Sequence, residues 1–418
     1  MNELKVSTSR LEGQVAISGA KNSALKLLAA SLLTSDRVLL ENYPCSLADC
    51  DIHVQMLEAL GKKCIVSSDD TIEIVEAEPA SSSLVWKGRS IRNTLLILGA
   101  LTTRTGAGSV PLPGGCNLGD RAIDLHEYVL RTLGAEVWQE GGELKAAVSG
   151  GRLKGADIHL RLRSTGATEN AILCGSLAEG KTTIWNPHIR PEILDLIAML
   201  RSMGAQIKVF SQERIEVMGV DHLDGACHRV IPDNMEAITW LAGAVMTGGD
   251  VEIVGFPYDD LAVVLVHLEA AGARLYRNDE SLIVRGGTCY PIEISTGPHP
   301  GINSDVQPIL AAWAACARGE SRIVDLRFPG RYGYADEMAR MGVKHSIRGD
   351  MLVVEGNGGL LKGAPVRALD LRAGVSLALC GLVAQGETTI TDAWQITRGY
   401  ANFTEKLRNL GADAQWIA

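Results

Sequence analysis

The 418-residue sequence lacks three features, and each absence excludes a class of protein. It has 40 Lys and Arg against 49 Asp and Glu, so its net charge of −9 gives no overall positive field to attract nucleic acid or an anionic membrane. No apolar run approaches the length of a membrane span, and the start, MNELKVSTSR, lacks the apolar core of a signal peptide. We therefore expect a soluble, cytoplasmic protein without nucleic-acid or membrane partners.

The sequence also lacks paired cysteines. Its nine cysteines are scattered over the chain and include no CxxC pair, which argues against a disulfide framework or a zinc site. Most lie in apolar segments such as AILCGSLA and are predicted to be core residues. Cys116 is the exception, because it stands in the loop sequence PLPGGCNLGDRAIDLH (111–126), five residues before Arg121. This setting predicts an exposed, reactive thiol.

An internal repeat organises the chain. A sequence motif (phrase) of the type LRTLGAE recurs six times, and the glycines of consecutive copies are 68 to 73 residues apart. Each phrase is typical of an amphipathic helix that ends at a glycine and is followed by a strand. The glycines are Gly61, Gly134, Gly204, Gly272, Gly342 and Gly411.

Each repeat also has a second, more apolar helix upstream of the phrase, such as MEAITWLAGAVMT, followed by a short strand such as DVEIVG. These helices are apolar nearly all round, which predicts that they lie buried in the middle of a domain. The expected unit is strand–helix–strand–strand–helix–strand, and six copies predict an α/β protein of two domains with three units each. Two N-terminal segments, LKVSTS and GQVAIS, are predicted to be strands that pair with the last unit.

The predicted buried helices begin at residues of unusual chemistry. Three of the six starts carry a cation: Lys21, Arg92 and Arg372. A helix N-terminus has a partial positive charge, so a cationic side chain there is unfavourable. It becomes favourable when the backbone amides of the helix end and the side chain bind the same anion. The pattern thus predicts two sets of helix ends that bind an anionic ligand. The alternative is that these side chains point to solvent. The other starts are Thr165, Asn234 and Asp305.

Several of these stretches together resemble the enolpyruvyl transferases. The stretches are ISGAKNSALKLLAASLL, LPGGCNLGDRAIDLH, STGATEN, GPHPGINSDVQ, DLRAGVSL and TRGY, and the resemblance runs in order from residue 17 to 411. It implies a two-domain inside-out α/β barrel built from six βαβαββ units. It also implies that residues 19–229 form one domain, and that residues 1–18 and 230–418 form the other.

The resemblance implies transfer of the enolpyruvyl group of phosphoenolpyruvate to a hydroxyl of UDP-N-acetylglucosamine, with release of phosphate, in peptidoglycan precursor synthesis. The substrates are small molecules, and neither a cofactor nor a metal is expected. By this resemblance Cys116 protonates C3 of phosphoenolpyruvate, Asp305 is the base for the acceptor hydroxyl, and Lys21 is a third catalytic residue. A thiol near Lys21 and Arg121 suits the acid role, because nearby cations lower its pKa.

The same resemblance assigns the binding residues. Lys21, Arg92 and Arg121 match residues around the phosphate of phosphoenolpyruvate. The full set for phosphoenolpyruvate is Lys21, Asn22, Arg92, Arg121, Arg331, Arg372 and Arg398, of which the last three match residues around its carboxylate. The set predicted for the acceptor is Asn22, Arg92, Arg121, Asp124, Leu125, His126, Arg163, Ser164, Thr165, Gly166, Asp305 and Arg327.

The sequence departs from the family pattern at positions near the expected acceptor. Arg163, Arg190 and Arg327 stand where small, acidic or apolar residues are usual, Asn234 replaces an arginine, and QITRGY lacks a usual His and Asp. The added positive charge leaves another acceptor open, such as a nucleoside monophosphate in specialised metabolism. An inactive sugar-nucleotide-binding paralogue is a further alternative.

Plainer roles also remain open for three of the predicted site residues. Asp305 would then only cap a helix, Arg331 would be a surface loop residue, and His126 would be a packing or capping histidine.

Overall fold

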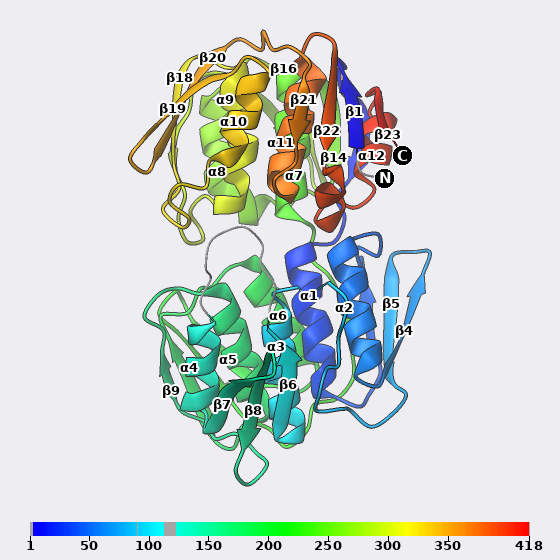
Figure 1. Cartoon of the computed structure of the whole chain (residues 1–418), viewed down its shortest axis with the longest axis vertical. Coiled ribbons are helices and arrows are strands. Elements are labelled where there is room, and N and C mark those ends of the chain that lie inside the picture. The colour runs from blue at the N-terminus through cyan, green and yellow to red at the C-terminus, as the bar shows by residue number, and fades with distance from the viewer. Residues whose placement is uncertain (1–2, 90, 113–122, 418) are drawn as a thin grey trace. The chain divides into compact units, whose positions relative to one another are not determined.

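The computed structural model describes residues 3–89, 91–112 and 123–417 (Figure 1). The chain divides into two compact units, one formed by Gly19–Ile231 and the other by Met1–Ser18 together with Pro232–Ala418. The division lies two residues after the expected boundary of 229/230. Within the described ranges, the helices are all too short or too polar to cross a lipid bilayer.

Among the described residues, each unit contains three small sheets. In Gly19–Ile231 the strand orders are β13-β3-β5-β4, β6-β8-β7 and β9-β10-β12-β11. The strands are β3 Val38–Glu41, β4 Lys62–Ser67, β5 Thr71–Glu76, β6 Ala107–Pro111, β7 Ala135–Glu140, β8 Glu143–Val148, β9 Asp157–His159, β10 Lys181–Trp185, β11 Gln206–Phe210, β12 Arg214–Met218 and β13 Ala226–Arg229.

In the other unit the strand orders are β15-β16-β14-β2, β17-β18-β20-β19 and β21-β22-β1-β23. The strands are β1 Glu3–Ser7, β2 Glu12–Ala16, β14 Asp250–Val254, β15 Ala273–Arg277, β16 Ser281–Gly287, β17 Glu293–Ser295, β18 Arg318–Val324, β19 Lys344–Arg348, β20 Met351–Asn357, β21 Pro365–Arg367, β22 Glu387–Thr391 and β23 Ala414–Ile417.

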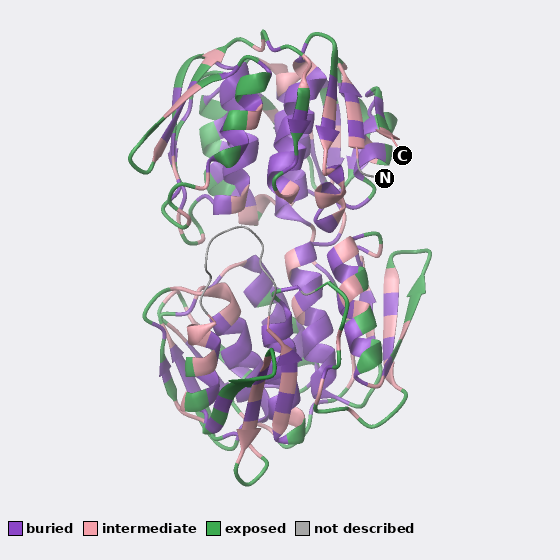
Figure 2. Cartoon of the chain, in the orientation of Figure 1, coloured by how far each residue is buried: buried purple, intermediate pink, exposed green. Residues whose placement is uncertain are grey.

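The apolar helices form the interior of each unit, as predicted. They are α1 Lys21–Ala30, α3 Thr94–Thr105 and α5 Thr165–Leu177 in one unit, and α7 Asn234–Met246, α9 Gln307–Cys316 and α11 Leu371–Val383 in the other. Figure 2 shows them buried over most of their length. Helices α3 and α5 approach so closely that a Cβ on Gly99 would lie 1.8 Å from the Asn170 side chain, which requires glycine there.

The second helix of each repeat is amphipathic and ends where the sequence predicts. These helices are α2 Ala48–Ala59, α4 Asp124–Thr132, α6 Pro191–Ser202, α8 Tyr258–Ala270, α10 Gly333–Arg340 and α12 Phe403–Asn409. All six repeat glycines follow them with a positive φ of 84° to 102°, a conformation that favours glycine. Three 3₁₀ helices, η1 Ser31–Leu33, η2 Ser304–Val306 and η3 Ala393–Arg398, complete the described elements.

The order of elements within a repeat differs from the expected strand–helix–strand–strand–helix–strand. In the third repeat it is β9, α5, β10, α6, β11, β12. Strands β9 and β10 are parallel and need a helical crossover, whereas β11 and β12 are antiparallel and need only a turn. The two strands of the hairpin are therefore adjacent in the chain, after the second helix.

Two strands beside the points where the chain passes between the units pair with strands far away in sequence. Strand β2 precedes α1 in sequence but pairs in parallel with β14, and β13 precedes α7 but pairs in parallel with β3. Strand β2 thus joins Pro232–Ala418 from the separate N-terminal segment, whereas β13 pairs within Gly19–Ile231.

The N-terminal strands met the prediction only in part. Strand β1 pairs with β22 and β23 of the last repeat, as expected, and lies beside the C-terminal strand in Figure 1. Strand β2 was expected in the same place, but it joins the fourth repeat. The reason is that β1 already fills the free edge of β22, while β14 needs a parallel partner.

Candidate active site

Lys21 begins helix α1 and is paired inside its own unit. Its Nζ lies 2.7 Å from Asp49 Oδ2 on α2, and the two side chains are only 10% and 5% exposed. Arg89 Nη2 lies 3.8 Å from the other oxygen of the same carboxylate. The helix end therefore tolerates a lysine because Asp49 supplies the compensating negative charge. Asn22, the next residue, is half-buried.

Two buried imidazoles of the same unit are uncharged at neutral pH. His53 Nδ1 lies 3.0 Å from Asn93 Nδ2, and His126 Nδ1 lies 3.3 Å from Asn170 Nδ2. Burial lowers the pKa of each histidine to about 3, because the charged form loses its hydration. His126 also packs against Gly166, where an added Cβ would approach the ring to 2.9 Å. Its contacts are those of a packing histidine.

Three of the residues predicted for the acceptor, Ser164, Thr165 and Gly166, lie at the start of α5. Ser164 caps the helix by accepting a hydrogen bond from Ala167 N, and Thr165 Oγ1 lies 2.8 Å from His188 Nδ1. Asp124, the first residue of α4, forms an ion pair with Arg161. Leu125 follows it and is half-buried.

Three of the arginines singled out from the sequence lie in this unit, and their surroundings differ. Arg190 makes a two-pronged ion pair with Glu192, with distances of 2.7 and 2.8 Å, so a local carboxylate balances its charge. Arg163 Nε donates to Asn186 Oδ1 at 3.3 Å, which leaves its charge without a carboxylate among the described contacts. Arg92 is exposed and close enough to His126 to lower the pKa of that imidazole, after the larger effect of burial.

In the other unit, Asp305 lies between two arginines. Its Oδ1 accepts from Arg331 Nη1 at 3.0 Å, and its Oδ2 lies 3.6 Å from Arg372 Nε. Arg331 also donates to Asp370 Oδ2 at 3.1 Å. Burial opposes the charge of Arg331, but Asp305 and Asp370 outweigh it and raise the pKa of that guanidinium. The two arginines are thus linked through one shared carboxylate.

Arg372 is 1% exposed and lies in the first turn of α11. Its Nε and Nη1 are buried and make no hydrogen bond within the described part of the chain. Burial disfavours its charge, yet the neighbouring Tyr400 and Asp305 raise the pKa of the guanidinium, whose carbon lies 5.2 Å from the Tyr400 ring centre. Arg398, at the end of η3, donates to Gln395 Oε1 at 2.9 Å.

Arg327 lies on the loop after β18 and is exposed. Its guanidinium carbon lies 5.5 Å from the Phe328 ring centre, and partial burial lowers the pKa of the side chain. No carboxylate lies within ion-pair distance among the described residues. The same loop leads to Arg331, so Arg327 belongs to the segment that carries a predicted binding residue.

Two plainer roles are excluded by these contacts. Asn303 is the cap residue, because its side chain accepts from Asp305 N at 3.0 Å, so Asp305 does not serve as the cap. Arg331 is not a surface loop residue, since its side chain is only 10% exposed and binds two carboxylates.

The sequence reasoning missed the carboxylates that hold the cations. Asp49 pairs with Lys21, Asp370 pairs with Arg331 while capping α11, and Asp233 caps α7 and contributes to the charge balance of Arg372. The signal for two of them was available, since an Asp directly before an apolar helix is a common N-cap.

Cys116 and Arg121 lie outside the described residues. Eight other cysteines are described, and all are free. Cys227 is exposed, so Cys116 is not the single exception to the core interpretation. The thiol of Cys50, close to Lys21, is fully buried, and burial raises its pKa to about 12. Cys50 therefore cannot substitute as a reactive thiolate.

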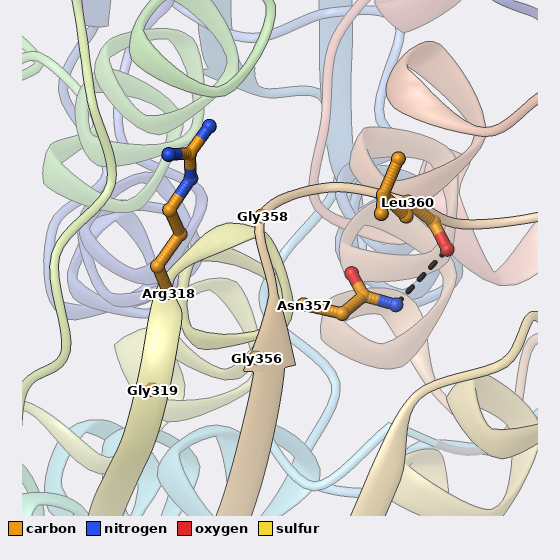
Figure 3. Close-up of a pocket in the computed structure, with 6 residues that line it drawn as sticks. All are labelled: Arg318, Gly319, Gly356, Asn357, Gly358 and Leu360. Atoms are coloured by element: carbon orange, nitrogen blue, oxygen red, sulfur yellow. Dashed lines mark hydrogen bonds between the residues drawn. The ribbon is translucent and has the colours of Figure 1, made fainter.

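A cavity of about 380 Å³ opens at the end of β18 and β20 (Figure 3). Its lining contains no acid, base or nucleophile and none of the predicted site residues. We therefore do not place the chemistry there. The lining residues are Arg318, Gly319, Gly356, Asn357, Gly358 and Leu360.

The chain as a whole is similar to known proteins in sequence and in structure. The profile of EPSP synthase (3-phosphoshikimate 1-carboxyvinyltransferase) matches residues 6–407. UDP-N-acetylglucosamine 1-carboxyvinyltransferase of Sphingopyxis alaskensis is 38% identical over 417 residues, which cover 98% of this chain and 97% of that protein. UDP-N-acetylglucosamine 1-carboxyvinyltransferase 2 of Carboxydothermus hydrogenoformans is 40% identical over 416 residues, with the same coverage of 98% and 97%.

Among solved structures, the enolpyruvyl transferase NikO from Streptomyces tendae matches with a TM-score of 0.90 and 26% identity, over 99% of each chain. The matches in sequence and in structure extend over nearly the whole of this chain and of its relatives, so both units are included. The chain belongs to the EPSP synthase family and is an enolpyruvyl transferase.

Proposed function

We propose that this enzyme transfers the enolpyruvyl group of phosphoenolpyruvate to a hydroxyl of UDP-N-acetylglucosamine, with release of phosphate, for peptidoglycan precursor synthesis. The observation that carries the proposal is the state of Arg372: its Nε and Nη1 are buried without a hydrogen bond within the described part of the chain, and Nε lies 3.6 Å from Oδ2 of Asp305. Unsatisfied buried donors cost about 1–3 kcal/mol each, so such an arrangement favours a site that a ligand anion completes. The relatives at 38–40% identity support the choice of acceptor.

In the proposed reaction Asp305 takes the proton of the acceptor hydroxyl, whose oxygen attacks C2 of phosphoenolpyruvate. Cys116 gives a proton to C3, and the resulting tetrahedral ketal then loses phosphate and a proton from C3. Such a base and acid each contribute about 10²–10⁴-fold to the rate. Arg331, Arg372 and Arg398 hold the substrate carboxylate, while Lys21, Arg92 and Arg121 hold the phosphate. These fixed cations stabilise the charge that develops on the ketal.

The present pairing of Asp305 supports an exchange of anions during binding. Its carboxylate and that of Asp370 now accept hydrogen bonds from Nη1 and Nη2 of Arg331. A substrate carboxylate at Arg331 and Arg372 would replace Asp305 there, which frees Asp305 to accept a proton. We also propose that the six repeats form the inside-out α/β barrel of the family, three repeats to a unit.

A second acceptor class remains a candidate because of two arginines. Arg163 and Arg327 have no carboxylate within ion-pair distance among the described residues, whereas Arg190, the third departure, is balanced by Glu192. A phosphate bound by either arginine would gain about 1.5–3 kcal/mol for each charge-assisted hydrogen bond. A nucleoside monophosphate offers such a group.

The purified enzyme with phosphoenolpyruvate and either acceptor decides between these classes by the rate of phosphate release. Turnover with UDP-N-acetylglucosamine supports the first proposal. Turnover only with a nucleoside monophosphate, lost in the Arg163→Met/Arg327→Met double variant, supports the second. The matched control is Arg190→Met, whose charge is balanced locally. No phosphate with either acceptor would favour an inactive paralogue.

A further inference from the structure

A buried carboxylate joins the loop of Arg327 and Arg331 to the segment that carries Asp305. Asp325 is 0% exposed and directly follows β18. We infer that Asp325 is a positioning residue, which never meets substrate but fixes Asp305 and the arginine loop for the reaction. This inference rests on the proposed function, in which Asp305 is the base.

The two oxygens of Asp325 accept four hydrogen bonds from three chain segments. Oδ1 accepts from Thr296 Oγ1 at 2.8 Å and from the backbone nitrogens of Arg327 and Phe328 at 2.9 and 3.0 Å. Oδ2 accepts from Ser304 Oγ at 2.6 Å. Four donors balance a buried carboxylate without a cation, and hydrogen bonds to a charged group are the stronger kind.

The bond to Ser304 fixes the backbone next to the proposed base. Ser304 is 6% exposed and begins η2, and Asp305 is the following residue. Asp305 N donates to Asn303 Oδ1 at 3.0 Å, so hydrogen bonds hold both the backbone of Asp305 and the side chain of the preceding Ser304. The carboxylate of Asp305 is thereby directed to Arg331 rather than to its own helix.

A second path from Asp325 leads to the arginine loop. Asp325 N donates to Tyr332 Oη at 2.9 Å, and Tyr332 Oη donates to Asp350 O at 2.7 Å. Tyr332 is 1% exposed and is the neighbour of Arg331 in the chain. Asp325 thus holds both residues of the Asp305–Arg331 pair through their neighbours.

The other repeats show that this arrangement is not a general property of the fold. The residue directly after the corresponding strand has a positive φ in four repeats: 51° at Asn42, 55° at Asn186, 76° at Gly255 and 53° at Asp392. Asp325 occupies the same place after β18 but is not among the positive-φ residues. The turn is therefore built differently in the repeat that carries Asp305.

The test uses two matched variants, because Ser304 and Thr296 both donate to Asp325 but only Ser304 adjoins Asp305. We expect Ser304→Ala to lower kcat about 10- to 100-fold, as a small displacement of a reacting group does, with little change in the KM for phosphoenolpyruvate. Ser304→Thr keeps the hydroxyl and restores kcat, and Thr296→Val retains kcat near that of wild type. In an Asp305→Asn background, Ser304→Ala has no further effect. Wild-type kcat in Ser304→Ala, or an equal loss in Thr296→Val, overturns the inference.

Amide hydrogen exchange separates failure of this inference from failure of the proposed function. In Ser304→Ala the amide of Asp305 exchanges faster than in wild type, whereas in Thr296→Val it does not. This readout needs no turnover, so it applies even if no acceptor yields phosphate. Unchanged exchange at Asp305 in Ser304→Ala contradicts the positioning role whatever the activity.

Discussion

The two units are built from the same repeat but treat the cations at their helix ends differently. In Gly19–Ile231, Lys21 has a short ion pair with Asp49, and Arg190 a two-pronged pair with Glu192. In the other unit, Asp305 is shared by Arg331 and Arg372, and Arg372 keeps two buried donors without a hydrogen bond. The first arrangement balances charge within the protein, and the second leaves hydrogen-bonding capacity for a ligand. The two units therefore share a fold, but they differ in ligand-binding capacity because their carboxylates pair differently with the cations.

The largest expected effect is on kcat, and it tests whether one unit supplies a general acid and the other a general base. Cys116→Ser and Asp305→Asn should each lower kcat about 10²–10⁴-fold, since each removes a general acid or base. Circular dichroism should report an intact fold in both. Near-normal phosphate release by either variant would remove that residue from the proposed mechanism.

The next prediction compares the single ion pair with the shared network. Asp49→Asn removes the carboxylate 2.7 Å from Lys21 and should reduce the free energy of unfolding by about 3–5 kcal/mol. Asp370→Asn should cost less, because Arg331 keeps Asp305 and asparagine still caps α11. Urea unfolding of the two variants measures both losses. An equal loss of unfolding free energy in the two variants would show that sharing Arg331 between two carboxylates does not reduce the effect of removing one of them.

A third prediction concerns the donors of Arg372. Arg372→Lys keeps the charge but loses the planar fork, so the KM for phosphoenolpyruvate should rise about 10- to 100-fold, the value of one or two charge-assisted hydrogen bonds. Arg318→Lys is the matched control, because Arg318 lies in the same unit at the cavity of Figure 3. A similar KM in both variants would argue that Arg372 does not bind the substrate.

The smallest expected effect is a dependence of stability on pH in Gly19–Ile231. His53 and His126 have a pKa of about 3 in the folded protein, below the ordinary value of 6.5, so the unfolded chain binds more protons between these values. Their contribution is complete above pH 6.5 and is lost as the pH falls, by about 2 kcal/mol per imidazole at pH 5. Urea unfolding of wild type and His126→Gln at pH 7 and pH 5 measures it. If the unfolding free energy depends on pH in the same way in both proteins, His126 does not contribute as predicted.

Local patterns in the sequence predicted the repeating parts of the fold. The six glycines and the apolar helices follow from turn geometry and helix periodicity, which act over a few residues. The pairing of β2 with β14 and of β13 with β3 did not follow, because either strand suits a parallel neighbour and the choice depends on residues more than 150 positions away. Asp305 and Arg331 were predicted by resemblance, whereas Asp49 and Asp325 were missed because their partners lie on other segments.

Enolpyruvyl transfer requires that the C–O bond of phosphoenolpyruvate breaks. Phosphoenolpyruvate with ¹⁸O in the bridging position, turned over with UDP-N-acetylglucosamine, tests this directly by mass spectrometry. We expect the label in the released phosphate and an unlabelled enolpyruvyl group on the acceptor. Label retained in the three-carbon product would mean that the P–O bond breaks, and would contradict enolpyruvyl transfer.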